Sequence, residues 1–174
     1  TLPDSVTSVG KGAFSNDTAL RSVHLGSGVA SIGESAFVGS NNLASLTVDP
    51  ANTVYSVEDG ALYGKGDAGR TLVLYLPTKT DSDVTVPEGT TAIADAAFAN
   101  NSSLRRVVLP EGVTTIGYGA FDGDANLADI VIPDSVTVAR GLVGNGLDTI
   151  ELGSKVTELW MTPRQTTTPR HIIV

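Results

Sequence analysis

The chain reads LPEGVTTIGYGAFDGDANLADIVI at residues 109–132 and LPDSVTSVGKGAFSNDTALRSVHL at residues 2–25. The two stretches share their apolar positions around a central Ala-Phe pair. Phe14 recurs as Phe37 and Phe98 recurs as Phe121, which sets a repeat period of about 23 residues. A period of about 20–50 residues is typical of a solenoid, in which each unit buries its apolar side against its neighbours.

Each unit predicts its own local structure. In the first stretch quoted, Val113 is expected to face the core, and Gly117 to bend the chain. The Ala-Phe pair is then expected to insert into the interior beside a helical or 3-10 turn. In the strand that follows, Ile130 and Ile132 alternate inward. Pro133 ends this strand, because proline has no N–H to donate to a ladder.

A short polar side chain stands three places after each Phe. Such side chains bond nearby backbone N–H groups and hold tight turns, so a structural role is predicted for them. These residues are Asp17, Ser40, Asn101 and Asp124.

The period breaks first between Val48 and Val86, which occupy equivalent strand positions. The interval between them exceeds one period by about 15 residues. Within residues 49–77, two apolar runs joined by a Gly-rich turn predict a β-hairpin. We expect this hairpin to replace the Ala-Phe segment of its coil and to project from the stack.

The period breaks again in the last unit, which is shorter than the others. Leu127 recurs already as Leu147, before a full period has passed. This unit also lacks a Phe. Leu142 or Val143 is therefore expected to take the place of the Phe in the core.

The predicted organisation is one solenoid domain over residues 1–159, a stack of about six to seven coils. Residues 160–174 leave the pattern and are predicted to be a tail or linker. Their last three residues, 172–174, either add a closing strand or begin another domain. Because Leu2-Pro3 aligns with Leu109-Pro110 at the end of a strand, the chain is expected to be a fragment of a longer protein.

Composition argues against several classes of function. The formal net charge is −8, which disfavours nucleic-acid binding, because nucleic-acid backbones select basic patches. The same charge disfavours binding to a membrane surface. No apolar run is long enough to span a bilayer. The chain has no Cys, which removes thiolate catalysis and cysteine-ligated zinc.

The unit L-P-x-x-V-x-x-I-G-x-x-A-F-x-x-x-x-x-L-x-x-V-x-L resembles the BspA-like leucine-rich repeat. The resemblance covers roughly residues 2–159 and implies a right-handed β/α solenoid on a secreted or cell-surface protein. Such proteins occur in host-associated bacteria and some protists, and resemble adhesins. Their partners would be host or microbial surface proteins or glycans. Family members often carry Cys at the third position after the Phe, where this chain has Asp, Ser or Asn.

The sheet of a solenoid is its usual binding face, so the outward strand residues are the candidate contacts. By register they are Ser22, His24, Ser45, Thr47, Arg106, Val108, Asp129, Val131, Thr149 and Glu151. Arg106 is of a type that protein-interaction hot spots favour, as are the hairpin residues Tyr55, Tyr63 and Tyr75. The alternative is that the strip is merely solvated and that the tyrosines pack the hairpin onto the stack.

No catalytic, metal or cofactor site is predicted. His24 has Thr47 and serines as neighbours by register but lacks the acid that a catalytic triad requires. Residues 122–126 resemble the start of a calcium loop, but Leu127 and Pro133 stand where that loop needs Gly and Glu, so a polar turn is predicted. The leading hypothesis is a non-enzymatic binding or adhesion segment. The second is a structural spacer that presents another domain, and the third is a hydrolase-like enzyme.

Overall fold

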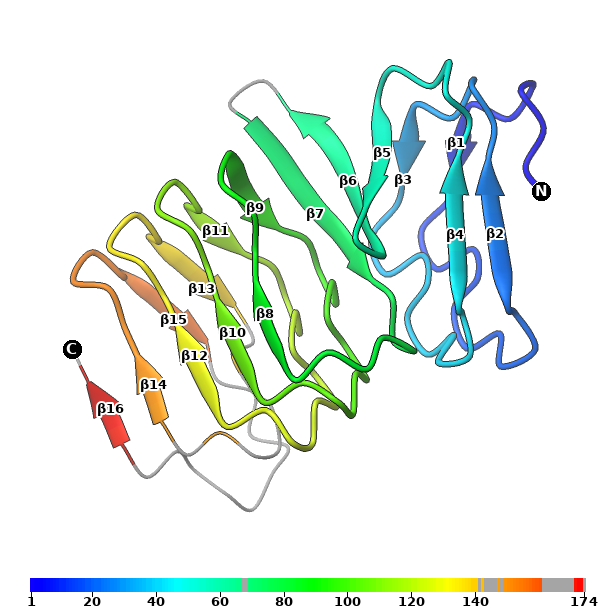
Figure 1. Ribbon diagram of the computed structural model, residues 1–174. Helices are drawn as coiled ribbons and strands as arrows, with labels where there is room; N and C mark the ends of the chain where they lie inside the picture. The colour runs from blue at the N-terminus through cyan, green and yellow to red at the C-terminus, as the bar shows by residue number, and fades with distance from the viewer. Residues whose placement is uncertain (67–68, 141, 143–146, 148, 161–170, 174) are drawn as a thin grey trace.

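The computed structural model describes residues 1–66, 69–140, 142, 147, 149–160 and 171–173. The described chain forms successive coils that stack beside one another as a solenoid, as the repeat period predicts. Figure 1 shows the stack from the blue N-terminal coil to the red C-terminal strand. All regular elements in the described residues are β-strands.

One side of the stack, here called the front face, holds the strand that follows the polar loop of each coil (Figure 1). Its strands are β2 (Ser22–Leu25), β4 (Ser45–Val48), β8 (Asp83–Thr85), β10 (Arg106–Val108), β12 (Asp129–Val131), β14 (Thr149–Glu151) and β16 (His171–Ile173). β2 pairs with β4, and the other five form a separate sheet in the order β16-β14-β12-β10-β8. The strands pair in parallel and in register, so equivalent repeat positions lie side by side.

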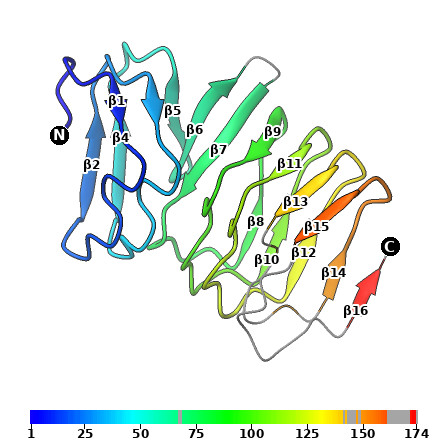
Figure 2. The same ribbon diagram turned by 180° about the vertical axis from the view of Figure 1, so that it is seen from behind.

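The other side, here called the back face, holds the strands that come before each turn (Figure 2). They are β1 (Ser8–Val9), β3 (Ser31–Ile32), β5 (Tyr55–Glu58), β6 (Ala61–Gly66), β7 (Gly69–Tyr75), β9 (Thr90–Ile93), β11 (Thr115–Ile116), β13 (Val138–Arg140) and β15 (Glu158–Trp160). β1 pairs with β3, and the remaining seven form one sheet in the order β15-β13-β11-β9-β7-β6-β5.

The segment around each Phe is a hydrogen-bonded turn, so the prediction of helical or 3-10 turns is wrong for the described residues. Residues two places before and after the Phe have positive φ, which a right-handed helix excludes. Around Phe98 these are Ala96 (φ 56°) and Asn100 (φ 65°). Their N–H groups and that of Phe98 donate to carbonyls of the next coil, as Phe98 does to Ala120 at 2.8 Å. We call these inter-coil bonds the turn ladder.

The core is aliphatic with a stack of aromatic rings through it. Phe98 and Phe121 are fully buried, and their ring centroids lie 5.1 Å apart. Phe14 and Phe37 stack in the same way at 5.4 Å. In the shortened last coil Leu142 is fully buried, as predicted, while the alternative Val143 lies outside the described residues.

The polar residues after each Phe hold the turns, which confirms their predicted structural role. Asn101 Oδ1 accepts the N–H groups of Ser103 and Leu104, and its own N–H donates to Asp124 Oδ1 at 2.7 Å. Ser40, Asn101 and Asp124 are buried, whereas Asp17 at the start of the stack is exposed. Asn101 and Asp124 therefore accept loop N–H groups within a coil and between coils, and the Ser40 hydroxyl donates to the Phe14 carbonyl of the preceding coil.

The inserted segment contains the predicted hairpin, because β6 and β7 pair antiparallel. Two features of the prediction are wrong. A third strand, β5, pairs antiparallel with β6, and the three strands do not project, because β7 pairs in parallel with β9 in the back sheet. Tyr75 replaces the Phe of its coil: its N–H donates to Ala97 at 2.7 Å, and its ring lies 5.2 Å from that of Phe98.

The insertion stays in the stack because both of its faces are apolar. Leu62 and Leu74 belong to the core cluster of the N-terminal coils. Tyr63 and Leu72 belong to the core cluster of the C-terminal coils. A hairpin projecting into water would expose one of these faces, at a cost of about 25 cal/mol per Å² of apolar area. The three strands instead separate two cores and contact both.

The C-terminal residues of the described chain extend the front sheet. β16 pairs in parallel with β14, with Ile172 opposite Ile150. Ile172 and Ile173 therefore add a strand to the sheet, and Val174 lies outside the described residues. No helix long and apolar enough to cross a membrane occurs among the residues that the structure describes.

Candidate binding surfaces

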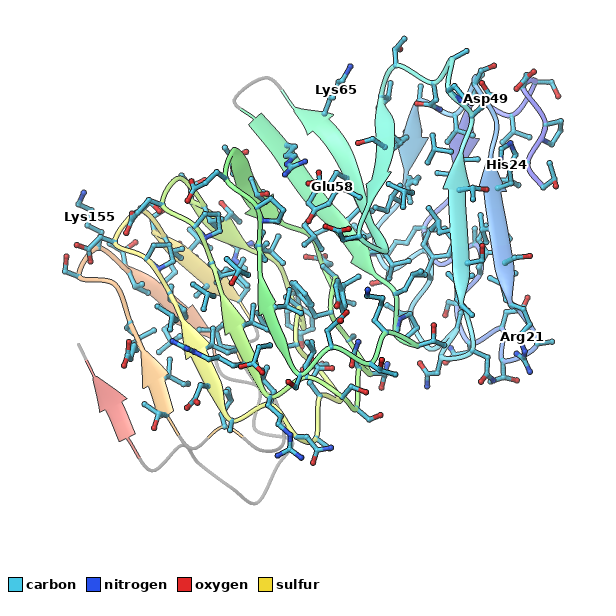
Figure 3. The ribbon with its side chains drawn as sticks, in the orientation of Figure 1. Arg21, His24, Asp49, Glu58, Lys65 and Lys155 are labelled. Atoms are coloured by element: carbon cyan, nitrogen blue, oxygen red, sulfur yellow. The ribbon has the colours of Figure 1, made fainter. Side chains whose placement is uncertain are left out.

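The first part of the front face is the two-stranded sheet β2–β4. Ser22 lies opposite Ser45 and His24 lies opposite Thr47, as predicted from the period. His24 Nδ1 and Thr47 Oγ1 are 2.9 Å apart and share a hydrogen bond. Figure 3 shows His24 on β2, away from the larger sheet. This sheet therefore presents small hydroxyl side chains around one imidazole.

The second part is the five-stranded sheet, where two rows of side chains run across the strands. In one row Arg106 lies between Asp83 and Asp129, and Thr149 follows. In the other row, two partly buried residues, Val108 and Val131, lie between Thr85 and Glu151. A row of alternating charge beside a small apolar row is a surface that can contact both polar and apolar groups of a partner.

Asp83 and Thr85 belong to this surface, although the sequence prediction does not include them. A signal for them exists in the sequence. Val84 and Val86 alternate inward ahead of Pro87, just as Val107 and Leu109 do ahead of Pro110. The residues between them must therefore face outward, as Arg106 and Val108 do. The equivalence of Val86 with Val48 in the repeat gives the same register for these two residues.

The ten predicted front-face residues do not form one strip. Ser22, His24, Ser45 and Thr47 lie on the sheet β2–β4, and the others lie on the five-stranded sheet. The chain between β4 and β8 forms the three inserted strands, so no front strand pairs with both sheets. The front face of the described chain therefore offers two separate surfaces.

The predicted hairpin contacts are mostly internal. Tyr63 and Tyr75 are 4% and 5% exposed, and Tyr55 is partly buried. Burial raises the pKa of Tyr63 to about 12, and the Arg70 guanidinium lies 4.4 Å from the centre of its ring. Burial also raises the pKa of Tyr75, whose hydroxyl donates to Asp81 at 2.6 Å. These two tyrosines pack the insertion onto the stack, as the alternative prediction states.

A cavity of about 340 Å³ lies between the insertion and β8, and its lining carries four carboxylates. They are Glu58, Asp59, Asp81 and Asp83. Two of them are paired with cations, because Arg70 contacts Glu58 at 2.5 Å and Lys79 contacts Asp81 at 2.9 Å. The Tyr75 hydroxyl and Lys79 lower the pKa of Asp81. This arrangement ties β5, β7 and the following loop together.

The segment at residues 122–126 forms a polar turn with inter-coil hydrogen bonds. Asp124 Oδ1 accepts from the Asn101 N–H, and Asn126 Nδ2 donates to the Ser102 carbonyl at 2.7 Å. Burial raises the pKa of Asp124 to about 8. Among the described residues no group of three or more His, Cys, Asp or Glu side chains is arranged to hold a metal ion.

A larger cavity, of about 440 Å³, lies between the second coil and the insertion, and we call it the slot. Residues 30–38, which include β3 and the turn to Phe37, form one wall. Val54, Tyr55 of β5 and residues of β6 and β7 form the other wall, and Ala94–Ala96 close one end. Figure 3 shows Lys65, one of the lining residues, near the tip of β6.

The chain is similar to several solved leucine-rich repeat structures. A leucine-rich cell surface protein from Faecalibacterium prausnitzii is 30% identical with a TM-score of 0.72, and the match covers 90% of this chain and 48% of that one. A leucine-rich repeat protein from Eubacterium ventriosum is 23% identical with a TM-score of 0.79, covering 96% of this chain and 53% of that one. The pneumococcal vaccine antigen PcpA is 20% identical with a TM-score of 0.64, covering 88% and 50%.

This chain thus spans about half the length of these structures. The matches to the Eubacterium protein and to PcpA, the two with the lower identities, support the fold alone. A search of curated proteins found no match. The model of the BspA-type leucine-rich repeat region matches residues 1–66 and 78–159 with six copies, and the uncovered residues 67–77 fall within the insertion, where the period is lost. The chain belongs to the BspA-type leucine-rich repeat family.

Proposed function

We propose that this chain is a non-enzymatic binding segment of a secreted or cell-surface protein, with an adhesion-type role. Its partners are host or microbial surface proteins or glycans. The observation that carries the proposal is the pair of rows on the five-stranded sheet, centred on Arg106 and Val108. The similarity to a bacterial leucine-rich cell surface protein supports the location.

The chemistry of the two rows favours a protein partner over a glycan. Arg106 is exposed between Asp83 and Asp129, and arginine is enriched in interface hot spots. The partly buried Val108 and Val131 add apolar area in the middle of the sheet. Apolar area bordered by charge is the usual composition of a protein interface. The five-stranded sheet gives the partner contact across several coils at once.

The experiment is a binding screen with the folded chain against immobilised matrix proteins, bacterial surface proteins and glycans. Hits are then measured with Arg106→Glu, which reverses the central charge of the row. The matched control is Arg105→Glu, an exposed neighbour outside the strand that brings the same change in net charge. Loss of binding with the first variant and retention with the second supports the proposal. Absence of any hit with correctly folded chain contradicts it.

A structural spacer is the second candidate, and the continuity of the coils favours it. Core residues are buried on both sides of the insertion, and the insertion contacts both clusters. Such a stack holds its ends at a fixed separation whether or not it binds anything. In this case neither Arg106→Glu nor Arg105→Glu changes adhesion by a protein that contains the chain.

A further inference from the structure

We propose that the slot binds an extended polypeptide segment of a partner protein, which occupies the place of the coil that the insertion displaces. The proposal deepens the proposed function, on which it rests for the existence of a protein partner. It concerns a surface distinct from the rows on the five-stranded sheet. The slot lies between β3 on one side and the start of β5 together with β6 and β7 on the other.

The turn ladder is interrupted at the slot. In the first coil the N–H groups of Gly12, Phe14 and Asn16 donate to the carbonyls of the second coil at 2.7–3.1 Å. Their equivalents in the second coil are Ser35, Phe37 and Gly39, one period later. The N–H groups of these three make no hydrogen bond with any part of the chain that the structure describes. Ser35 and Phe37 both line the slot.

The same wall also carries carbonyls that lack a donor. In the first coil Thr7 and Val9 accept hydrogen bonds from the second coil, each at 2.8 Å. The equivalent carbonyls in the second coil are those of Ala30 and Ile32, and they accept none from the described residues. Both residues line the slot. Tyr55, which also lines the slot, hydrogen-bonds the backbone of Ile32. Apart from that bond, this wall presents open acceptors along β3 and open donors along the turn within the described chain, a pattern that another coil satisfies elsewhere.

At the far end of the slot, the hydrogen bonds of the turn ladder are also incomplete. The Tyr75 N–H donates to the Ala97 carbonyl, so the insertion makes one of the three turn-ladder hydrogen bonds that a regular coil makes. The Asp95 carbonyl is equivalent to that of Glu34, which accepts from Gly12 at 3.1 Å. No described residue donates to the Asp95 carbonyl, and Asp95 lines the slot. The insertion thus restores the ladder only in part.

These groups specify an extended peptide as the occupant. An extended segment offers N–H and C=O groups in alternation along its edge, and adding such a segment to an open strand edge is a common mode of peptide recognition. A helix bonds its own backbone internally and is about 10–12 Å wide. A cavity of about 440 Å³ encloses only a few residues of such a segment, and a longer segment extends beyond it.

The charges of the chain further restrict which peptide segment is favoured in the slot. The slot lining includes two carboxylates, Glu34 and Asp95, and one ammonium, Lys65. The whole chain has a net charge of −8. Lys11 pairs with Glu34 at 2.7 Å, so the preference for a segment that carries lysine or arginine over an acidic one rests on the net charge of the whole chain.

The test uses a synthetic peptide of two lysines followed by TTIGYGAF, the sequence of residues 114–121, which cover the same face of a regular coil. Amide hydrogen exchange of the folded chain is followed with and without this peptide. In the free chain the Phe37 and Ser35 amides exchange faster than those of Phe98 and Phe14. The peptide slows Phe37 and Ser35 on the order of tenfold or more. The same peptide N-methylated at alternate residues does not.

A variant in which a bulky side chain fills the slot tests whether the peptide binds there. Thr71→Trp places an indole in the slot, because Thr71 is partly buried and lines it. Val138→Trp is the control, since Val138 is partly buried on the same back sheet but outside the slot. Protection by the peptide is lost in the first variant and kept in the second. Unchanged exchange at Phe98 verifies that both variants fold.

Two results overturn the proposal. One is a Phe37 amide as slowly exchanging as that of Phe98 in the free chain. The other is peptide binding that Thr71→Trp leaves unchanged. Failure of the proposed function is seen separately, because it is measured by the binding screen and Arg106→Glu. Protection of the Phe37 amide by the peptide supports the slot as a peptide-binding site even when that screen finds no partner.

Discussion

The carboxylate of Asp124 accepts the backbone N–H of Asn101 at 2.7 Å, across one repeat period of the chain. Both residues are fully buried. The second oxygen of Asp124 has no hydrogen-bond partner among the described residues, and burial raises the pKa of the group to about 8. Asp124 is therefore mostly protonated at pH 7, because burying a charged carboxylate costs more than burying a neutral one.

Asp124→Asn is expected to stabilise the fold, and more so at pH 9 than at pH 5. The folded-state pKa of about 8 lies above the ordinary value of 3.8, so the folded chain binds the proton more tightly. The contribution of Asp124 to stability is thus greatest below pH 3.8 and falls as the pH rises to about 8. Each unit of pKa difference is worth about 1.4 kcal/mol, so the gain at pH 9 is a few kcal/mol.

The measurement is urea unfolding of Asp124→Asn and the parent chain at both pH values. Asp17→Asn is the control, since Asp17 occupies the equivalent position in the first coil but is exposed. Asp17→Asn, at an exposed site, should change stability little. An equal stability change for Asp124→Asn at pH 5 and pH 9 would show that Asp124 is ionised across this range.

Phe98→Ala is expected to cost about 3–5 kcal/mol of unfolding free energy, as for other buried Phe truncations. Phe98 is fully buried, and its ring lies between those of Tyr75 and Phe121. Phe14→Ala should cost less, because Phe14 is partly exposed and stacks on Phe37 alone among the described rings. Denaturant unfolding measures both. A cost below about 1 kcal/mol for Phe98→Ala would be inconsistent with the observed core.

Gly117→Ala and Gly10→Ala are expected to have different effects, although both glycines bend the chain at the same repeat position. A Cβ on Gly117 would lie 2.5 Å from the Asp95 nitrogen of the preceding coil. A Cβ on Gly10 would meet nothing within 4 Å. Gly117→Ala should therefore cost about 1–3 kcal/mol by overpacking. Thermal unfolding of both variants tests the contrast, and equal losses would argue against close coil-to-coil contact at Gly117.

Arg106→Glu is expected to lower stability by about 0.5–1 kcal/mol, apart from any effect on binding. The substitution places three acidic side chains side by side, because Asp83 and Asp129 are the cross-strand neighbours of Arg106. The loss should shrink in high salt, since the charges are exposed and screened. Arg106→Thr removes the charge without adding repulsion and should cost less. A loss that is unaffected by salt would point to a packing role for Arg106.

The sequence predicts most of the regular coils because one period fixes both the fold and the register. Residues one period apart, such as Arg106 and Asp129, lie opposite one another without further information. The turn around each Phe is predicted wrongly, because its hydrogen bonds run to the next coil and a local pattern does not reveal them. The alternation of the hairpin is visible in the sequence. Its burial is not, because only the assembled stack shows that Leu62 and Tyr63 contact different cores.

The slot cannot be predicted from residue types. Its defining groups are backbone N–H and C=O groups of residues such as Phe37 and Ile32, and every residue except proline carries both. Only the missing neighbour distinguishes them from their equivalents at Phe14 and Val9. A break in period indicates where to look for such groups, and the structure identifies them.

The three inserted strands also affect how an array of this kind can change in evolution. Leu62 and Leu74 face the N-terminal coils, and Tyr63 and Tyr75 face the C-terminal ones, so each side needs only to fit its own face of the insertion. Duplication or deletion of a coil on one side leaves the packing on the other side intact. The insertion is therefore a joint at which the lengths of the two halves can diversify independently.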